Sequence, residues 1–255
     1  MSYLNTKPLL YGIEHSPVRE EISLITEYPS LIADKLLNDE IDIGLVPVSI
    51  IPGMAEYHIN TRFCIGCDGP VASVCLFSEV PVGQIRTVLL DYQSRTSVAL
   101  AEILFERLWK HKPDFQHAEP GFLEQINGNT AAVVIGDRAL QQKFISAYSY
   151  DLGEAWKELT GLPFVFAAWI SNKPLDPGWI QRFDEANAFG IQNISLAIEN
   201  LPPMNLDLNE YFTRFLSYDF DERKQKGLRY FLDLLSEQKQ GTFSQNISAE
   251  RTGFN

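Results

Sequence analysis

Short apolar runs alternate with amphipathic stretches along most of the chain. Each run spans only a few residues and is bounded by charge, proline or glycine, as is typical of strands that are buried on both faces. The pattern predicts strands at residues 22–26, 41–46, 71–77, 86–90, 131–135 and 163–170.

Between these runs, apolar residues recur at helical spacing. The spacing predicts helices at residues 8–12, 28–37, 98–108, 179–198 with an interruption at Gly190, 209–216, and around an apolar face of Leu228, Phe231, Leu232 and Leu235. Alternation of strand and helix is typical of parallel sheets with right-handed crossovers. The predicted class is therefore α/β.

The length of 255 residues lies where single cores begin to split into two domains. We expect two lobes, each a mostly parallel sheet flanked by helices, with a ligand cleft between them. The first lobe is predicted to comprise residues 1–80 and 171–255, and the second, inserted lobe residues 81–170. The chain would then cross between lobes near residues 78–82 and 168–172, which would form a hinge.

Composition narrows the classes of partner. Lys and Arg number 21 against 33 Asp and Glu, a formal charge of −12, which disfavours nucleic acid. No apolar run is long enough for a membrane span and no secretory signal is visible, so we expect a cytoplasmic protein without a membrane partner. A small molecule is the expected partner, and the oligomeric state stays open.

The cysteines indicate neither a disulfide framework nor a metal site. Cys64, Cys67 and Cys75 are an odd number, and the pair Cys64 and Cys67 lacks the second ligand pair that zinc requires. We therefore expect no metal and no cofactor, and thiols that are buried or partly exposed.

The opening segment, residues 2–8 (SYLNTKP), reads as a loop that begins a helix. Thr6 is a suitable N-cap and Pro8 suits the first turn. Free backbone N–H groups and the helix dipole there favour an anion, and Tyr3 and Asn5 add neutral hydrogen-bonding groups. The alternative is that Asn5 and Thr6 only cap the helix.

Two further segments place polar residues beside predicted strands. Residues 91–97 repeat the design of strand, polar loop and helix start, and Gly136 follows the strand at 131–135. Ligands of open α/β sheets bind at such carboxyl ends. Ser73 either lines the cleft or is a backbone-bonded core hydroxyl, and Gly136 either permits a close backbone approach or is an ordinary turn glycine.

Four motifs occur together and in order: SYLNTKP (2–8), EIDIGLVPV (40–48), GPVASVCLFS (69–78) and DYQSRTSVA (91–99). On these motifs the chain resembles the chorismate dehydratases of the futalosine route to menaquinone. The resemblance implies a fold similar to the two-lobed type II periplasmic binding proteins. It also implies dehydration of chorismate to 3-[(1-carboxyvinyl)oxy]benzoate.

The chain departs from this family at one point. Family members carry an apolar strand just before the SYLN motif, whereas Met1 alone precedes Ser2 here. Without that strand, a central position of the first sheet would leave the backbone groups of two neighbours unpaired.

The resemblance implies a site that holds a dianion and assists loss of a ring hydroxyl and a neighbouring proton. The expected binding residues are Ser2, Tyr3, Thr6, Ser73, Ser94, Arg95, Thr96, Ser97 and Gly136. Arg95 is expected to fork onto one carboxylate. The four histidines lie outside all four motifs, so we hypothesise that the substrate's enolpyruvyl carboxylate removes the proton while Asn5, the expected catalytic residue, orients it.

Two other functions are compatible with the same pattern. One is a non-catalytic solute-binding protein of the same fold. The other is an enzyme like 1,4-dihydroxy-6-naphthoate synthase of the same pathway, which takes a larger substrate. Turnover of chorismate to an aromatic product would separate these from the dehydratase.

Overall fold

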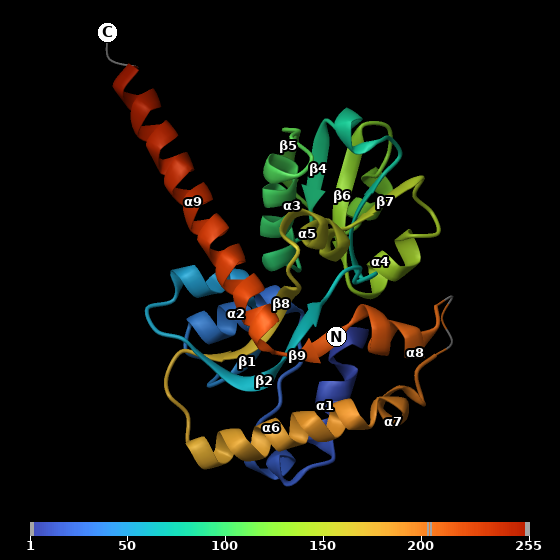
Figure 1. Ribbon diagram of the computed structural model, residues 1–255, viewed down its shortest axis with the longest axis vertical. Helices are drawn as coiled ribbons and strands as arrows, with labels where there is room; N and C mark the ends of the chain where they lie inside the picture. Colours follow the sequence, from blue (N-terminus) through green and yellow to red (C-terminus); the bar gives the residue numbers. More distant parts are fainter. Residues whose placement is uncertain (1–2, 203, 205, 253–255) are drawn as a thin grey trace.

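Two β-sheets divide the molecule into two lobes (Figure 1). The computed structural model describes residues 3–202, 204 and 206–252, with residues 239–252 described only as helix backbone. The first lobe contains α1 (Lys7–Glu14), α2 (Pro29–Leu37), β1 (Gly44–Pro47), β2 (His58–Cys67), β8 (Phe164–Ser171), α6 (Pro177–Gln192), α7 (Ile194–Ile198), α8 (Leu208–Glu210), β9 (Ser217–Asp219) and α9 (Glu222–Thr252). The second contains β3 (Val74–Ser78), β4 (Thr87–Leu90), α3 (Thr96–Arg107), β5 (Asp114–His117), β6 (Thr130–Ile135), α4 (Asp137–Gln142), β7 (Tyr148–Asp151) and α5 (Leu152–Thr160).

The first sheet has the strand order β1-β8-β2-β9. Every pair in it is antiparallel, so the expectation of a mostly parallel sheet is wrong for this lobe. The reason is β8, which returns from the second lobe and enters between β1 and β2 in the opposite direction.

The second sheet is mixed, with the order β5-β4-β6-β3-β7. β4 runs parallel to β5 and to β6, as the strand–helix rhythm predicted for this stretch. β3 is antiparallel to both of its neighbours, because it arrives directly from the first lobe and not through a helix of the second.

The lobe boundaries differ from the predicted ones, because two strands belong to the other sheet than expected. β3 was expected in the first lobe but belongs to the second sheet, and β8 was expected in the second lobe but belongs to the first. The chain therefore crosses between β2 and β3 and again between α5 and β8. The predicted crossings near 78–82 and 168–172 lie inside or beyond strands that each belong to one sheet.

The strand predicted at residues 22–26 is absent, although this segment is described in full. Its backbone is extended but belongs to neither ladder, and β1 is an edge strand on the side that faces it. A strand needs a neighbour for its N–H and C=O groups. Apolar alternation alone therefore could not make this segment a strand.

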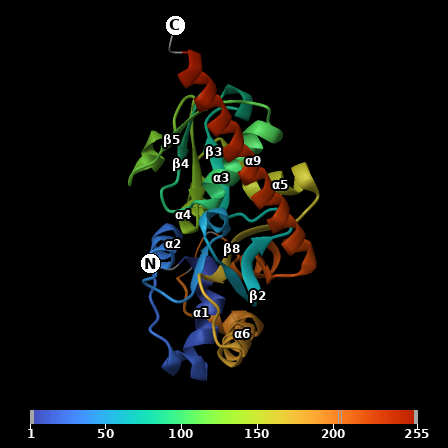
Figure 2. The same cartoon turned by 90° about the vertical axis from the view of Figure 1, so that its left-hand side faces the viewer.

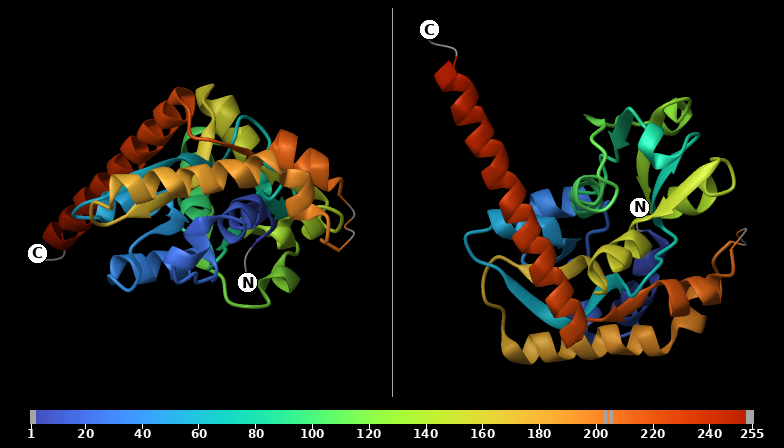
Figure 3. Two further views of the ribbon diagram at one scale, coloured as in Figure 1. Left: turned by 90° about the horizontal axis from the view of Figure 1, so that it is seen from below. Right: turned by 45° about the horizontal axis from the view of Figure 1, so that its top comes forward.

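Helices α1 and α6 lie against each other (Figure 3, left). Gly12 and Gly190 meet where the two helices touch. A Cβ atom on Gly190 would lie 1.9 Å from the carbonyl oxygen of Pro8, and one on Gly12 would lie 1.9 Å from that of Ala186. The predicted interruption at Gly190 is wrong, because α6 runs through it. The glycine serves close helix packing.

Helix α9 leaves the first lobe and projects along the second (Figure 2). The Arg107 guanidinium of α3 pairs with the Glu237 carboxylate of α9 at 3.0 Å. None of the described helices is both long enough and apolar enough to span a membrane.

The three cysteines are buried and free, as expected. Burial raises the pKa of the Cys64 thiol to about 12. It also raises the pKa values of Cys67 and Cys75, so these thiols behave as core residues.

Candidate functional site

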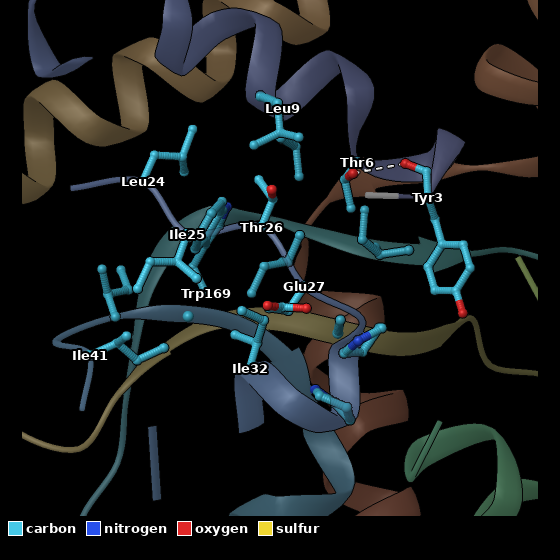
Figure 4. A pocket seen from close by; sticks show the side chains of 18 of the residues that line it. Tyr3, Thr6, Leu9, Leu24, Ile25, Thr26, Glu27, Ile32, Ile41 and Trp169 are labelled. Atoms are coloured by element: carbon cyan, nitrogen blue, oxygen red, sulfur yellow. Dashed lines mark hydrogen bonds between the residues drawn. The ribbon is translucent and has the colours of Figure 1, made fainter. Parts of the chain in front are cut away.

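A cavity of about 580 Å³ lies between the lobes and continues into the first lobe (Figure 4). Its polar end is lined by Tyr3, Asn5, Thr6, Ser73, Ser94, Ser97 and Gly136. Its apolar end, between β1 and the extended segment 22–27, is lined by Leu24, Ile25, Ile32, Ile41 and Trp169, whose side chains point toward one another in Figure 4.

The polar end gathers most of the residues that the sequence singled out. It combines residues from the opening loop, the start of β3, the start of α3 and the turn after β6. Arg95 and Thr96 are not among the lining residues. Ser2 lies outside the described residues.

The opening loop differs in detail from the predicted N-cap. A 3₁₀ turn (Leu4–Thr6) precedes α1, and the Thr6 hydroxyl donates back to the Tyr3 carbonyl at 2.8 Å. Thr6 is the N-cap residue of α1 and Pro8 lies in the first turn, as predicted, but the Thr6 side chain makes no cap bond to the helix. The 3₁₀ turn that precedes α1 takes the Thr6 hydroxyl to the Tyr3 carbonyl instead.

Part of the predicted anion site is filled by the protein itself. The Leu4 N–H donates to the Asp137 carboxylate of α4 at 3.1 Å. Burial raises the pKa of Asp137, while the Leu4 N–H and the nearby Lys7 charge lower it. A carboxylate from the second lobe thus takes the place that was predicted for a ligand anion at this turn.

Asn5 keeps its side chain available. Its backbone carbonyl accepts a hydrogen bond of 2.8 Å from the Tyr218 hydroxyl, which fixes the residue from behind. Its Oδ1 atom is buried and has no hydrogen-bond partner among the described residues. A buried polar atom without a partner is costly, so Asn5 carries unused hydrogen-bonding capacity at the cavity wall.

The start of α3 is capped by Ser94, whose hydroxyl accepts from the Ser97 N–H at 3.1 Å. The Thr96 hydroxyl accepts from the Ser49 N–H of the first lobe at 3.2 Å. The Arg95 guanidinium pairs with the Asp34 carboxylate, also in the first lobe, at 2.5 Å. The structure thus places Arg95 and Thr96 in contacts between the lobes and not at the cavity wall.

A charged cluster that the sequence reasoning missed lies behind Tyr3. The Arg138 guanidinium binds the buried Asp91 carboxylate at 2.7 Å and the Gln93 side-chain oxygen at 2.9 Å. The Tyr3 hydroxyl donates to the same Gln93 oxygen. Only the position of Arg138 directly after Gly136 and Asp137, at the carboxyl end of β6, could have indicated it.

Burial dominates the electrostatics of this cluster. It raises the pKa of Asp91, against the opposing charge of Arg138 and the Gln93 N–H bond of 3.1 Å. It also raises the pKa of the Tyr3 hydroxyl, which stays protonated at ordinary pH. Asp91 also holds its own loop, because its carboxylate accepts from the Gln93 N–H.

Gly136 permits a close approach, one of the two roles considered for it. Its φ is +65°, and a Cβ atom would lie 2.3 Å from the Tyr3 ring. Any larger residue would push Tyr3 away from Gln93. Gly136 therefore sets the distance between the opening loop and the second lobe.

The described lining residues include no Lys, Arg or His. The lining carboxylates are Glu21, Glu27, Glu40, Asp42 and Asp176, all from the first lobe. Neutral hydroxyl and amide groups therefore make up the polar end, with the positive charge of Arg138 one residue layer behind it.

The sequence matches a protein family and a distant curated relative. The family model described as "Menaquinone biosynthesis" matches residues 1–237. A chorismate dehydratase from Thermus thermophilus is 26% identical over 257 residues, covering 91% of this chain and 92% of that protein.

Solved structures share the fold at low identity. A protein from Archaeoglobus fulgidus has a TM-score of 0.68 at 17% identity, covering 92% of this chain and 94% of that one. The periplasmic aliphatic sulphonate-binding protein SsuA from Escherichia coli has a TM-score of 0.57 at 13% identity, covering 92% and 90%. The fold is that of periplasmic solute-binding proteins. With a family model that spans nearly all of the described residues, the chain belongs to the menaquinone biosynthesis family.

Proposed function

We propose that this protein is a chorismate dehydratase, which converts chorismate to 3-[(1-carboxyvinyl)oxy]benzoate and water. The observation that carries the proposal is Asn5, which lines the cavity and whose buried Oδ1 atom has no hydrogen-bond partner among the described residues. An amide there can accept from the ring hydroxyl or, with its NH₂ group, donate to a carboxylate. Membership of the family and similarity to a chorismate dehydratase support the choice of substrate.

The reaction breaks the C–H bond at the ring carbon that bears the enolpyruvyl ether and the C–O bond of the neighbouring hydroxyl. The electron pair of the C–H bond completes the aromatic ring, and the hydroxide takes up the proton and leaves as water. Aromatisation supplies the driving force. The protein has to orient the substrate and stabilise the departing hydroxyl.

We propose that the substrate's own enolpyruvyl carboxylate is the base. Three aspartates in or beside the motifs are engaged by other groups of the protein: Asp91 by Arg138, Asp137 by the Leu4 N–H, and the exposed Asp42 by Lys173 at 3.1 Å. No histidine or lysine is among the described lining residues. The hydroxyls of Ser94 and Ser97 at the start of α3 would hold a carboxylate of chorismate by neutral hydrogen bonds. The Ser73 side chain is fully buried and donates to the Val71 carbonyl at 3.4 Å, which is the core role considered for it.

The test is to incubate the protein with chorismate and follow the ultraviolet absorbance of the aromatic product. Asn5→Ala should lower turnover by on the order of a hundredfold, because one oriented donor is lost at the reacting centre. Asn5→Asp should be worse than Asn5→Ala, since it places an anion against an anion. Asn193→Asp, the same change on a half-buried residue after α6, should stay within about twofold of the wild type.

Three results would count against the proposal. Chorismate binding without product would indicate a solute-binding protein. Turnover only of a larger futalosine derivative would indicate the related naphthoate-forming enzyme. An Asn5→Asp variant that outperforms Asn5→Ala, with a new acidic limb in its pH profile, would show that a protein base can serve and that substrate assistance is wrong.

A further inference from the structure

The two residues directly ahead of Asn5 are held by the second lobe. The Gln93 side-chain oxygen accepts a hydrogen bond from the Tyr3 hydroxyl. The Asp137 carboxylate accepts from the Leu4 N–H at 3.1 Å. Gln93 lies between β4 and α3, and Asp137 begins α4, so both anchors belong to the second lobe. The turn that carries Asn5 therefore depends on contacts between the lobes.

The position of Tyr3 is passed on to Asn5 by a closed turn. The Tyr3 carbonyl accepts from the Thr6 N–H at 3.1 Å and from the Thr6 hydroxyl at 2.8 Å, which ties the two ends of the turn together. The Tyr218 hydroxyl of the first lobe donates to the Asn5 carbonyl at 2.8 Å. Because the backbone is bound on both sides of Asn5, the direction of its side chain follows from where Tyr3 is held.

The Gln93 side chain is itself fixed in direction. Its oxygen accepts from the Arg138 guanidinium at 2.9 Å, and its NH₂ group donates to the Tyr92 hydroxyl at 2.9 Å. Burial raises the pKa of the Tyr3 hydroxyl and the charge of Arg138 opposes the rise, so Tyr3 meets both members of this pair. The Gln93 oxygen is thus oriented by the second lobe toward the one residue of the opening loop that reaches it.

The surrounding loop does not depend on the Gln93 side chain. The Gln93 N–H donates to the Asp91 carboxylate and the Ser94 N–H donates to the Asp91 carbonyl, both at 3.1 Å. The Ser94 hydroxyl accepts from the Ser97 N–H at 3.1 Å. Gln93 is not among the described residues that line the cavity. A change of its side chain therefore reaches a ligand through Tyr3.

We propose that Gln93 is a positioning residue for Asn5: its side-chain oxygen holds the Tyr3 hydroxyl, and this bond fixes the turn that presents the Asn5 amide to the substrate. The proposal rests on the proposed function, in which Asn5 is the catalytic residue. Because Tyr3 and Gln93 belong to different lobes, the amide is placed only while the two lobes are in contact.

The test measures chorismate turnover by the full chain. Gln93→Leu removes the acceptor, and we expect kcat to fall by about tenfold with a smaller change in KM, because Ser94 and Ser97 stay in place while Asn5 is misplaced. Tyr3→Phe breaks the same bond from the other side and should lower kcat by a similar factor. The double variant should be no worse than either single variant. Gln116→Leu, the same change on an exposed residue of β5, should leave both constants unchanged.

A conservative variant separates positioning from stability. Gln93→Glu keeps an oxygen that accepts from Tyr3 and Arg138, and it should hold kcat within about threefold of the wild type. In an Asn5→Ala background, Gln93→Leu should lower kcat no further, because the residue through which Gln93 acts is gone. A loss through stability alone would instead lower kcat by the same factor in both backgrounds.

Two results overturn the proposal. One is an unchanged kcat in Gln93→Leu, and the other is an equal further loss in the Asn5→Ala background. If Gln93→Leu does not fold, Tyr3→Phe carries the same test, since it breaks the same bond and removes only a hydroxyl.

Failure of the proposed function would be visible separately. If the wild type does not convert chorismate, crystal structures of the wild type and of Tyr3→Phe decide the point. A displaced turn with Asn5 directed away from the cavity in the variant supports the positioning role, and an unchanged turn overturns it.

Discussion

The two lobes differ in how the strands of their sheets are paired where the sheet borders the cavity. In the second lobe the β4 and β6 strands each pair on both sides. In the first lobe β1 pairs only with β8, and its other side faces the apolar end of the cavity and the extended segment 22–27. Both sheets have central strands that are paired on both sides, but the open edge at β1 lines the cavity, whereas the edge strands β5 and β7 of the second sheet are not among its described lining residues.

The difference shows what pairing contributes beyond apolar sequence. Residues 22–26 and residues 86–90 look alike as short apolar stretches, yet only the second becomes a strand, as β4. The buried backbone groups of β4 find partners in β5 and β6. The segment 22–26 has no such neighbour, so its backbone groups depend on solvent in the cavity.

The largest expected effect is on amide hydrogen exchange. Amides of residues 22–26 should exchange at least about a thousandfold faster than those of β4 and β6, because core strands open only with most of the global unfolding free energy. Exchange measured by mass spectrometry at peptide resolution checks this. Equal protection in both segments would contradict the contrast between the lobes.

Adding a strand at the apolar end of the cavity gives a second exchange experiment on the same contrast between the lobes. Extending the chain ahead of Ser2 by a short segment of β-branched residues should slow exchange in both 22–26 and β1, since an added strand could pair with both. A Gly/Ser extension of equal length is the matched control and should change neither. Slower exchange with both extensions would mean that length alone, and not a paired strand, is responsible.

The fold was predictable from sequence where local pattern and pairing agree. The strands at 86–90 and 131–135 and the helix at 98–108 appear close to their predicted positions as β4, β6 and α3. The direction of β8 was not predictable, because an apolar run does not reveal which sheet it joins. The helix interruption predicted at Gly190 was wrong because this glycine serves a tertiary contact with α1, which the local sequence does not reveal.

The sequence predicted which loops form the site, but it did not predict which side chains contact one another there. The polar residues Asn5, Ser73 and Ser94 do line one cavity. Arg95 was expected there only because it is the cation within the motif. Arg95 pairs with Asp34, and Arg138 pairs with Asp91, between segments that are far apart in the sequence. The spacing of residues along a single sequence does not indicate such pairs.

A smaller effect concerns alkaline pH and again separates the lobes. The first lobe contains Tyr3, Tyr211 and Tyr218, whose pKa values are all raised by burial. Above about pH 10 the unfolded chain loses these protons while the folded chain keeps them, so the free energy of unfolding falls as pH rises, by about 1.4 kcal/mol per pH unit for each tyrosine. Denaturant titrations between pH 9 and 11.5, chosen to bracket the ordinary tyrosine pKa of about 10, measure the slope.

Tyr211→Phe isolates one of these contributions. Its hydroxyl has no hydrogen-bond partner within acceptable geometry among the described residues, so the change should have little effect at neutral pH. Above pH 10 the variant should lose stability less steeply than the wild type, by the share of one tyrosine. Identical slopes would mean that Tyr211 ionises in the folded state and that the first lobe is already open at that pH.

The smallest expected effect concerns the contact that joins the lobes at Arg95. The Arg95 and Asp34 side chains are 38% and 49% exposed, and such ion pairs typically contribute about 0.2–1 kcal/mol. If Arg95 instead bound a substrate carboxylate in the closed cleft, Arg95→Ala would cost about 2–5 kcal/mol in binding. Asp34→Ala would then leave binding intact.

We expect the two variants to behave alike, because the structure gives the Arg95 guanidinium to Asp34 and not to the cavity. Each should raise KM by no more than about fivefold, the equivalent of 1 kcal/mol, and their double variant should add little. Arg62→Ala, which breaks an ion pair with Asp184 inside the first lobe, controls for loss of a surface charge. High salt should narrow the difference from the wild type, because exposed pairs are screened. A large rise in KM for Arg95→Ala alone would instead move Arg95 into the substrate site and require the lobes to rearrange when the substrate binds.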